Sequence, residues 1–304
     1  MSSRARRVAF IGLGHMGGHM CRNVCTAGHH VSAFDLSPAA LRTARHDGAR
    51  PARSVADCVA DAEVLITSLP GPAEVQAVLS GAEGAIAHMG SGGLVIDMST
   101  SSREVGRAVL TTARAHGADF VDAPVAGQTI GAEAGTLAIY AGGSKRAFRR
   151  ALGLLEAMGD PQRIFHMGPS GTGYAVKLLL NQLWFMHAVA TAETLTVGLR
   201  AGVPIDRLHT ALVNSPANSG FLERDLRMVL DDGDYDEGFA MKLVTKDLGL
   251  AVDLARDAGV PVELAALVEQ IHRRARLTYG DRAGEMSAVR LYEDLADAPL
   301  RWRP

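Results

Sequence analysis

Of the chain's 304 residues, 47% are hydrophobic and 21% are charged, and its net charge at pH 7 is −2. This length and composition predict a globular protein with one large or two ordinary domains. The near-neutral charge indicates neither a nucleic acid nor a membrane surface as a partner, and no run of about 18 apolar residues predicts a membrane span. The basic segment 2–7 leads into an apolar strand rather than a signal-peptide core, so we expect a cytoplasmic protein.

The chain has three cysteines, Cys21, Cys25 and Cys58, which do not form the pattern of a disulfide framework. Cys21 and Cys25 lie four residues apart on a predicted helix and could face one metal ion. No nearby cysteine or histidine cluster completes a tetrahedral site, however. We therefore expect no metal site and interpret these cysteines as small apolar residues that pack against the sheet.

The first predicted strand, residues 8–11, breaks into glycines in the segment Gly12-Leu13-Gly14-His15-Met16-Gly17. A strand that ends in G-x-G-x-x-G and opens a helix is typical of a dinucleotide-binding turn. The first glycine permits the tight turn, the second lets the backbone approach a pyrophosphate, and the third lets the helix pack on the strand. The free N–H groups at the start of that helix, expected over 18–27, favour an anion.

A second predicted strand, residues 30–34, ends in Asp35. This acid follows Gly17 at close to the spacing of about 20 residues expected for a ribose-binding carboxylate. Such a carboxylate accepts hydrogen bonds from the adenosine ribose hydroxyls and repels a 2′-phosphate, and the following residues 36–38 place no arginine beside it. The pattern therefore predicts NAD as the cofactor, with NADP less favoured.

Strands and helices alternate through the first half of the chain. Further strands are expected over 64–69, 94–98, 120–125, 137–141 and 163–167, with helices over 39–47 and 147–158 among them. This alternation predicts an α/β fold, with an N-terminal Rossmann domain whose doubly wound, mostly parallel sheet has helices on both faces.

From residue 171 onward, helical periodicity dominates. Helices are expected over 174–201, 205–214, 221–230, 242–258 and 262–279, with a short one after 286. We therefore predict an NAD-binding domain over 1–168 and an all-helical substrate and dimerisation domain over 169–304. A long interdomain helix, about 171–201, would join them.

A candidate for proton transfer lies at the start of that long helix. Lys177 and Asn181 are four residues apart, so both side chains project from one face. Apolar neighbours surround Lys177, and partial burial at a domain junction would favour the neutral amine that a general base needs. Taken alone, the pattern favours a lysine that extends from an apolar helix into solvent.

Four segments, in order along nearly the whole chain, resemble the β-hydroxyacid dehydrogenase family, typified by 3-hydroxyisobutyrate dehydrogenase. They are the glycine turn with Asp35, the segment Asp122-Ala123-Pro124-Val125-Ala126-Gly127 followed by 131–137, the segment 171–181, and Lys246-Asp247-Leu248. The resemblance implies an NAD-dependent oxidoreductase acting on the CH–OH group of a small β-hydroxy acid, which binds between the two domains. The product would be a semialdehyde or a keto acid.

The resemblance also implies roles for individual residues. Lys177 would be the general acid/base at the substrate hydroxyl, Asn181 would support it by a hydrogen bond, and Gly127 would offer a backbone N–H to the substrate carboxylate. Further implied cofactor contacts are Leu69, Pro70, Thr100 and Lys246. Further implied substrate contacts are Ser99, Thr100, Ala126, Gln128 and Asp247.

The substrate loop departs from the family pattern. It commonly reads Ser-Gly-Gly, whereas this chain has Ala126-Gly127-Gln128. Losing the hydroxyl at 126 removes a hydrogen bond worth about 1–3 kcal/mol if nothing replaces it, and the Gln128 amide either replaces it or reads another substrate group. Gln182 stands where a second asparagine is usual, and Trp184 either shapes a pocket or packs in the core. These departures put 3-hydroxyisobutyrate itself in doubt but leave the reaction class.

Two other functions remain open. A biosynthetic imine or aldehyde-acid reductase would use the same scaffold, although imine reductases usually carry another residue in place of Lys177. A non-catalytic dinucleotide-binding module would typically lose this lysine. The sugar-phosphate relatives, the 6-phosphogluconate dehydrogenases, would need a basic cluster that is not evident.

The expected partners are a small hydroxy acid or carbonyl compound and further copies of the chain. Because the helical half has apolar faces, we expect a homodimer or homotetramer.

Overall fold

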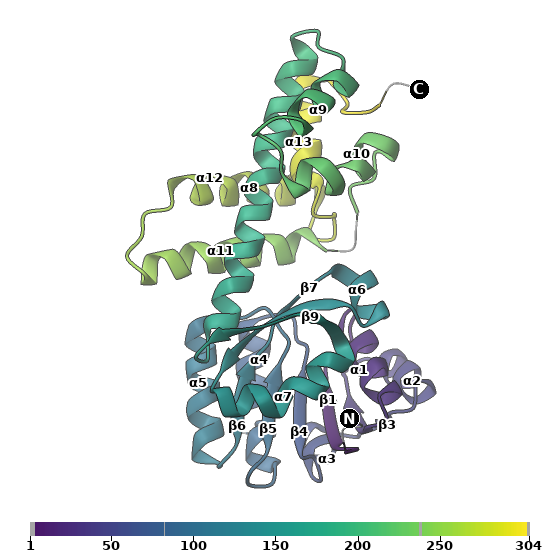
Figure 1. The fold of residues 1–304 in the computed structure, drawn as a ribbon, viewed down its shortest axis with the longest axis vertical. Helices are drawn as coiled ribbons and strands as arrows, with labels where there is room; N and C mark the ends of the chain where they lie inside the picture. Colours follow the sequence, from purple (N-terminus) through teal and green to yellow (C-terminus); the bar gives the residue numbers. More distant parts are fainter. Residues whose placement is uncertain (1–3, 82, 237–238, 303–304) are drawn as a thin grey trace. The chain divides into compact units, whose positions relative to one another are not determined.

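The structure is a computed structural model that describes residues 4–81, 83–236 and 239–302. Two compact units divide the chain, residues 1–177 and 178–304. The first unit thus ends at Lys177. The sequence had predicted a domain boundary nine residues earlier, after residue 168. Figure 1 traces the elements of each unit in chain order.

The first unit is built on a nine-stranded sheet in its described residues. Its strands are β1 (Arg7–Ile11), β2 (His30–Phe34), β3 (Arg50–Pro51), β4 (Val64–Thr67), β5 (Leu94–Asp97), β6 (Asp119–Asp122), β7 (Val125–Ala126), β8 (Leu137–Gly143) and β9 (Gly159–Gly168). The first six run parallel in the order β3-β2-β1-β4-β5-β6, which is typical of a Rossmann sheet. The predicted α/β fold with a mostly parallel sheet is confirmed.

The far side of the sheet departs from the parallel pattern. The segment predicted as one strand over 120–125 forms β6 and β7, separated by Ala123 and Pro124. Proline has no N–H to donate to a strand ladder, so the pairing changes there. Strand β8 returns antiparallel to both β6 and β7, and β9 then runs parallel to β8.

Helices cover both faces of the sheet. They are α1 (Gly17–Thr26), α2 (Pro38–His46), α3 (Val55–Val59), α4 (Pro72–Ser80), the 3-10 turn η1 (Ala85–His88), α5 (Arg103–Ala115), α6 (Gln128–Ala134) and α7 (Lys145–Met158). One core cluster contains side chains of α1, α2, α6 and α7, and the other contains side chains of α3, α4 and α5. Of the two cysteines expected to pack against the sheet, Cys21 is buried in the first cluster and Cys25 packs half-buried against it, and Cys58 is buried in the second cluster.

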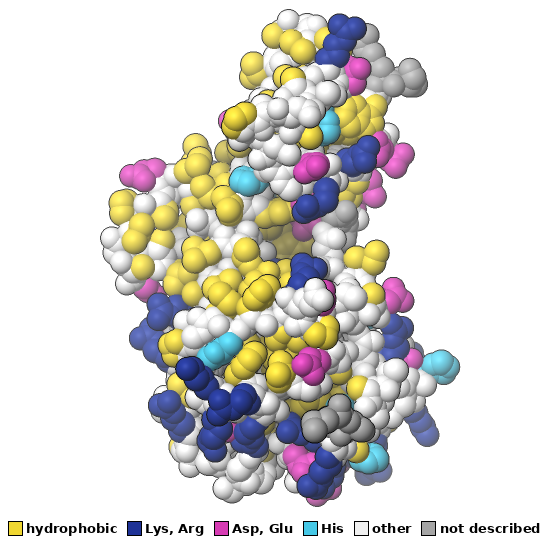
Figure 2. Space-filling model, viewed as in Figure 1, with side chains coloured by type: hydrophobic (Ala, Val, Ile, Leu, Met, Phe, Trp, Pro, Cys, Tyr) yellow, Lys and Arg dark blue, Asp and Glu magenta, His cyan; other side chains and the backbone are white. Residues whose placement is uncertain are grey.

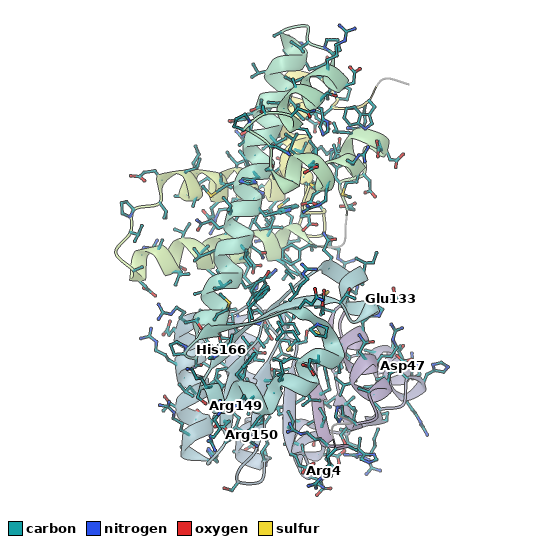
Figure 3. All side chains as sticks on the ribbon, viewed as in Figure 1. Arg4, Asp47, Glu133, Arg149, Arg150 and His166 are labelled. Atoms are coloured by element: carbon teal, nitrogen blue, oxygen red, sulfur yellow. The ribbon has the colours of Figure 1, made fainter. Side chains whose placement is uncertain are left out.

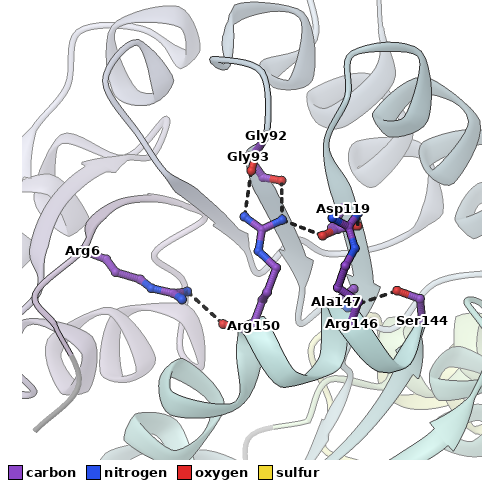
Figure 4. Close-up of polar contacts among 8 residues, drawn as sticks. All are labelled: Arg6, Gly92, Gly93, Asp119, Ser144, Arg146, Ala147 and Arg150. Carbon is purple, nitrogen blue, oxygen red and sulfur yellow. Dashed lines mark hydrogen bonds and ion pairs between the residues drawn. The ribbon is translucent and has the colours of Figure 1, made fainter.

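Ion pairs to the buried Asp119 carboxylate attach α7 to the amino end of β6. The Asp119 carboxylate contacts Arg146 and Arg150 at 2.5 Å each, and Arg150 also donates to the Gly92 carbonyl at 2.7 Å (Figure 4). Lys and Arg side chains gather over the lower part of the first unit, where α7 lies (Figure 2). These ion pairs therefore hold α7 at the amino ends of the strands, opposite to the carboxyl ends of β1, β4 and β5.

The second unit is helical, as predicted. Helix α8 (Thr172–Arg200) begins in the first unit, and α9 (Ile205–Val213), α10 (Arg227–Asp232), α11 (Met241–Asp257), α12 (Glu263–Tyr279) and α13 (Ser287–Ala296) follow it. The helix predicted over 221–230 is divided, because a π-helical turn (η2, Phe221–Asp225) precedes α10. There the Leu226 N–H donates to the Phe221 carbonyl, five residues earlier, which widens the turn while Phe221 stays buried. None of the helices among the described residues combines the length and apolar character needed to cross a bilayer.

Alanine at two glycines of the turn between β1 and α1 tests how tightly that turn is built. A Cβ on Gly17 would lie 2.0 Å from the Gly12 carbonyl oxygen, whereas one on Gly14 meets nothing within 4 Å. Overpacking costs about 1–3 kcal/mol, so we expect Gly17→Ala to lower the free energy of unfolding by about that amount. Gly14→Ala should change it by less than about 0.5 kcal/mol. Urea denaturation without cofactor measures both, and equal stabilities would contradict this description of the turn.

Candidate active site

The glycine turn at the end of β1 leaves an open stretch of backbone. Gly12 has φ +94°, and a Cβ there would lie 2.2 Å from the Ser68 carbonyl oxygen, so the turn requires glycine. Its N–H donates to the Phe34 carbonyl at 3.0 Å, which ties the turn to β2. Gly14 and His15 are exposed, and no side chain caps the start of α1. This uncapped, open helix start fits the pyrophosphate of a dinucleotide.

Asp35 is held directly beside this turn. Its Oδ2 accepts a hydrogen bond from the Leu13 N–H and its Oδ1 accepts one from the Ser37 N–H, both at 2.7 Å. A carboxylate has about four acceptor positions, so two remain for ribose hydroxyls. The position and chemistry of Asp35 therefore fit the adenosine ribose of NAD.

The strand order reverses between β1 and β4, where ligands of doubly wound sheets bind. Leu69 and Pro70 follow β4 at this edge. Leu69 is half-buried and Pro70 is exposed. The next strand, β5, is followed by Ser99 and Thr100. Ser99 is buried, accepts from the Leu69 N–H at 2.8 Å and donates to Asp97 at 2.6 Å. Ser99 thus links the backbone after β4 to the end of β5 by buried hydrogen bonds. Thr100 is partly exposed.

Two buried aspartates at the carboxyl ends of β5 and β6 had no predicted role. Asp97 accepts hydrogen bonds from the hydroxyls of Thr67 and Ser99 at 2.6 Å and of Tyr174 at 2.5 Å. Burial raises the pKa of Asp97, and these donors oppose the rise. Burial also raises the pKa of Asp122, to about 7. The one sequence signal is that both apolar strands end in aspartate.

The predicted substrate loop lies at the start of α6. Gly127 has φ +125° and Gln128 has φ +54°, a left-handed conformation that costs a residue with a side chain about 1–2 kcal/mol. Asn23 of α1 donates to the Ala132 carbonyl at 2.8 Å. Arg22 donates to the Glu133 carbonyl at 3.0 Å. Glu133 is labelled in Figure 3. The helices that follow the glycine turn and the substrate loop are thereby fastened together.

The other candidate residues lie on α8 and α11. Lys177 is one turn after Tyr174 and is the last residue of the first unit. In the second unit, the Asn181 amide donates to Asp247 Oδ2 at 2.7 Å, and the Lys246 ammonium lies 2.8 Å from Asp247 Oδ1. Asp247 is only 1% exposed. The structure thus brings Asn181, Lys246 and Asp247 into one contact cluster.

Trp184 packs against the helical core of the second unit, which is one of the two roles considered for it. Its indole N–H donates to Asp225 at 2.7 Å, and its ring packs edge-on against Phe185 and Phe221. It also lines a shallow, open depression together with Leu180 and other side chains of the second unit. Among the described residues, no group of three or more His, Cys, Asp or Glu side chains could hold a metal ion.

Comparisons with known proteins place this geometry in a family. Residues 7–168 match the model of the NAD binding domain of 6-phosphogluconate dehydrogenase, and residues 171–292 match the model for NAD-binding of NADP-dependent 3-hydroxyisobutyrate dehydrogenase. The chain belongs to the β-hydroxyacid dehydrogenase family. The predicted family is thereby confirmed, and so is the prediction of a nicotinamide-dependent oxidoreductase that uses NAD.

Relatives of this β-hydroxyacid dehydrogenase match over most of its length. It is 36% identical over 274 residues to the NAD-dependent L-serine dehydrogenase of Pseudomonas aeruginosa, covering 88% of this chain and 91% of the relative. It is 32% identical over 289 residues to the 2-(hydroxymethyl)glutarate dehydrogenase of Eubacterium barkeri, covering 95% of each. The solved structure of Mycobacterium tuberculosis 3-hydroxyisobutyrate dehydrogenase with L-serine has a TM-score of 0.87 and 32% identity, covering 96% of this chain and 99% of that one.

The choice between NAD and NADP can be tested at Asp35. Asp35→Asn keeps the side-chain size but removes the charge that would face a 2′-phosphate, and opposed like charges cost several kcal/mol. We expect the NADP:NAD ratio of kcat/KM to rise at least about tenfold. Asp47→Asn, at the end of the neighbouring helix α2 (Figure 3), is the control and should leave the ratio unchanged. An unchanged ratio in Asp35→Asn would exclude the ribose role.

Proposed function

We propose that this enzyme uses NAD to oxidise the hydroxymethyl group of a 3-hydroxypropanoate that carries a substituent at C2, giving a semialdehyde. The compounds in the relatives' names support this substrate class. L-serine, 3-hydroxyisobutyrate and 2-(hydroxymethyl)glutarate are all carboxylic acids with a hydroxymethyl group on the α-carbon, and they differ in the second substituent on that carbon.

The observation that carries the mechanism is the position of Lys177, one turn into a helix whose first turn is bonded to the carboxyl ends of β5 and β6. We assign the neutral Lys177 amine as the base that accepts the proton of the substrate hydroxyl. At the same time a hydride leaves the carbon that bears this hydroxyl. NAD supplies the hydride acceptor at C4 of its nicotinamide. In the reverse direction the Lys177 ammonium returns the proton to the aldehyde oxygen.

Asn181 supports this lysine from the next turn of α8. Its Nδ2 donates to Asp247, so the amide orientation is set and its oxygen remains as an acceptor. We assign that oxygen a hydrogen bond from the Lys177 ammonium or the substrate hydroxyl. Lys246, paired with the buried Asp247, then contributes a positive charge for the cofactor side of the site.

Lys177→Met tests the assigned base, because methionine keeps the length and the apolar stem of the side chain but cannot accept a proton. General acid–base groups contribute about 10²- to 10⁴-fold, so kcat should fall by at least about 100-fold while NAD binding stays within about twofold of the parent enzyme. Lys242→Met, at an exposed position of α11, is the control and should keep its activity. Steady-state kinetics on L-serine, 3-hydroxyisobutyrate and 2-(hydroxymethyl)glutarate measure both variants. Undiminished turnover in Lys177→Met would refute the mechanism.

The substrate loop has its own specificity residue in this proposal. Gly127 would donate its N–H to the substrate carboxylate, and the Gln128 amide would contact the C2 substituent. A residue held in a left-handed conformation at a candidate site is consistent with a functional demand that outweighs the strain. Gln128 would favour substrates whose C2 substituent can form hydrogen bonds, such as the amino group of serine.

Gln128→Gly separates strain from recognition. Glycine relieves the left-handed backbone, so the free energy of unfolding should rise by up to about 1 kcal/mol, while the preference for serine over 3-hydroxyisobutyrate in kcat/KM falls about tenfold. Asp297, with φ +49° at the end of α13, is the matched control because it is the other described residue with a side chain and a positive φ. Asp297→Gly should stabilise without changing the preference. A preference that survives in Gln128→Gly would exclude the assigned contact.

The predicted homo-oligomer remains a proposal. Helix α12 carries Leu264, Leu267 and Leu277, whose side chains are largely exposed, and apolar helix faces of this kind commonly pair with another subunit. Light scattering after size-exclusion chromatography distinguishes a dimer or tetramer from a monomer, and a monomer at micromolar concentration would refute it.

A further inference from the structure

The first turn of α8 is bonded to the sheet through one buried carboxylate. Asp122, the last residue of β6, accepts hydrogen bonds at Oδ1 from the Gly171 N–H at 2.7 Å and from the Ser170 hydroxyl at 3.1 Å. Its Oδ2 accepts a hydrogen bond from the Tyr174 N–H at 3.1 Å. One side chain thus bonds two of the N–H groups that a helix start leaves without a partner inside the helix.

The Asp122 carboxylate, β8 and the start of α8 pack closely together. A Cβ on Gly142 of β8 would lie 2.6 Å from Asp122 Oδ2, and a Cβ on Gly173 of α8 would lie 2.3 Å from the Tyr140 carbonyl oxygen. Glycine at both positions therefore lets the helix start, β8 and the carboxylate approach one another closely. Such close packing transmits a displacement of the carboxylate to the helix.

A second buried carboxylate holds the same turn by its side chain. The Tyr174 hydroxyl donates to Asp97 at the end of β5 at 2.5 Å, and the whole side chain is buried. On the other side, a Cβ on Gly106 of α5 would lie 3.0 Å from the Tyr174 ring. Lys177 follows Tyr174 by three residues, a rise of about 4.5 Å along the helix.

We propose that Asp122 is a positioning residue of this enzyme: through the backbone of the first turn of α8 it fixes where the Lys177 amine sits over the carboxyl edge of the sheet. The proposal rests on the proposed function of Lys177. Asp122 touches neither substrate nor cofactor in this account and acts only through the helix. A displacement of about 1 Å in a catalytic group can cost about 100-fold in rate.

The ionisation of Asp122 gives the proposal a readout in pH. The ionisable and charged groups around it are Tyr174 from α8, Asp97 from β5 and Arg103 from α5, whose side chain lies beside Gly171. Burial raises the pKa of Asp122 to about 7, so below pH 7 the carboxyl holds a proton and loses acceptor capacity for the helix N–H groups. The kcat profile should therefore contain an acidic limb near pH 7.

Stability should change with pH in the opposite sense. The unfolded chain releases the Asp122 proton near pH 4 and the folded chain retains it until about pH 7. Over that interval the folded state binds more protons, so the Asp122 contribution to the free energy of unfolding falls as pH rises and is level above pH 7. Through this one group the enzyme is thus more stable and less active at pH 5.5 than at pH 8.

The test compares Asp122→Asn with Asp119→Asn, two isosteric changes at opposite ends of the strand β6. Asparagine at 122 keeps one acceptor oxygen and turns the other into a donor that faces an N–H. We expect kcat to fall about ten- to 100-fold, the KM for NAD to stay within twofold, and the acidic limb to flatten. Hydrogen exchange at the Gly171 and Tyr174 amides should become faster. Asp119→Asn breaks the ion pairs of α7 and lowers the Tm, but kcat should stay within twofold and the limb should remain.

Ser170→Ala provides a variant that removes one side-chain donor and no backbone bond, in case Asp122→Asn does not fold. The Ser170 hydroxyl lowers the pKa of Asp122, so its removal should shift the acidic limb to higher pH. A limb that stays in place in Ser170→Ala, or Asp122→Asn with parental kcat and exchange rates, would overturn the proposal. Lys177→Met run in parallel keeps the two claims apart: if it remains active, the proposed function fails, whereas if it is inactive and Asp122→Asn is not impaired, only the positioning role fails.

Discussion

The arrangement of the first unit depends on two carboxylates that are buried where β5 and β6 end. An ionised carboxylate inside a protein is costly unless hydrogen-bond donors surround it. Asp97 accepts hydrogen bonds from three side-chain hydroxyls and Asp122 from two backbone N–H groups and one hydroxyl, and both bond to Tyr174. For Asp122, whose donors are residues 170, 171 and 174, the cost of burial is therefore offset only when α8 starts at this place. Sheet edge and helix start are in this sense one structural unit.

The same edge of the sheet gathers the other candidate residues of the first unit. Parallel strands end side by side, so the glycine turn after β1, Asp35 after β2, Leu69 after β4 and Thr100 after β5 follow neighbouring strand ends without any long-range signal. The antiparallel return of β8 and the bonds from α1 to α6 hold the substrate loop in the same unit. The proposed ribose contact, the proposed carboxylate contact and the proposed base thus come from separate short segments attached to one sheet.

Local spacing made part of this predictable from the sequence. The glycine turn, the acid at position 35 and the alternation of strands and helices are each encoded within about 30 residues, and the structure has the corresponding elements. The roles of Lys177 and Asn181 came only from the family resemblance, because an isolated lysine on an apolar helix has no local mark of function. They stay predictions.

Other features depend on partners that are distant in sequence. The donors to Asp122 come from residues 170–174, about 50 positions away, and no spacing rule connects them. The π-helical turn at Phe221 accompanies packing against Trp184. Gln128 stands where the family has glycine, so the local sequence gave no sign of a left-handed residue.

The central claim is that the Lys177 amine exchanges the proton of the substrate hydroxyl. A crystal structure of the ternary complex with the reduced cofactor and a 3-hydroxypropanoate substrate tests it most directly. We expect the Lys177 Nζ within about 2.6–3.2 Å of the substrate hydroxyl oxygen, with the substrate carboxylate bound to the Gly127 N–H. A substrate hydroxyl bound by another side chain, with the Lys177 Nζ beyond hydrogen-bond reach of it, would show that Lys177 is not the base.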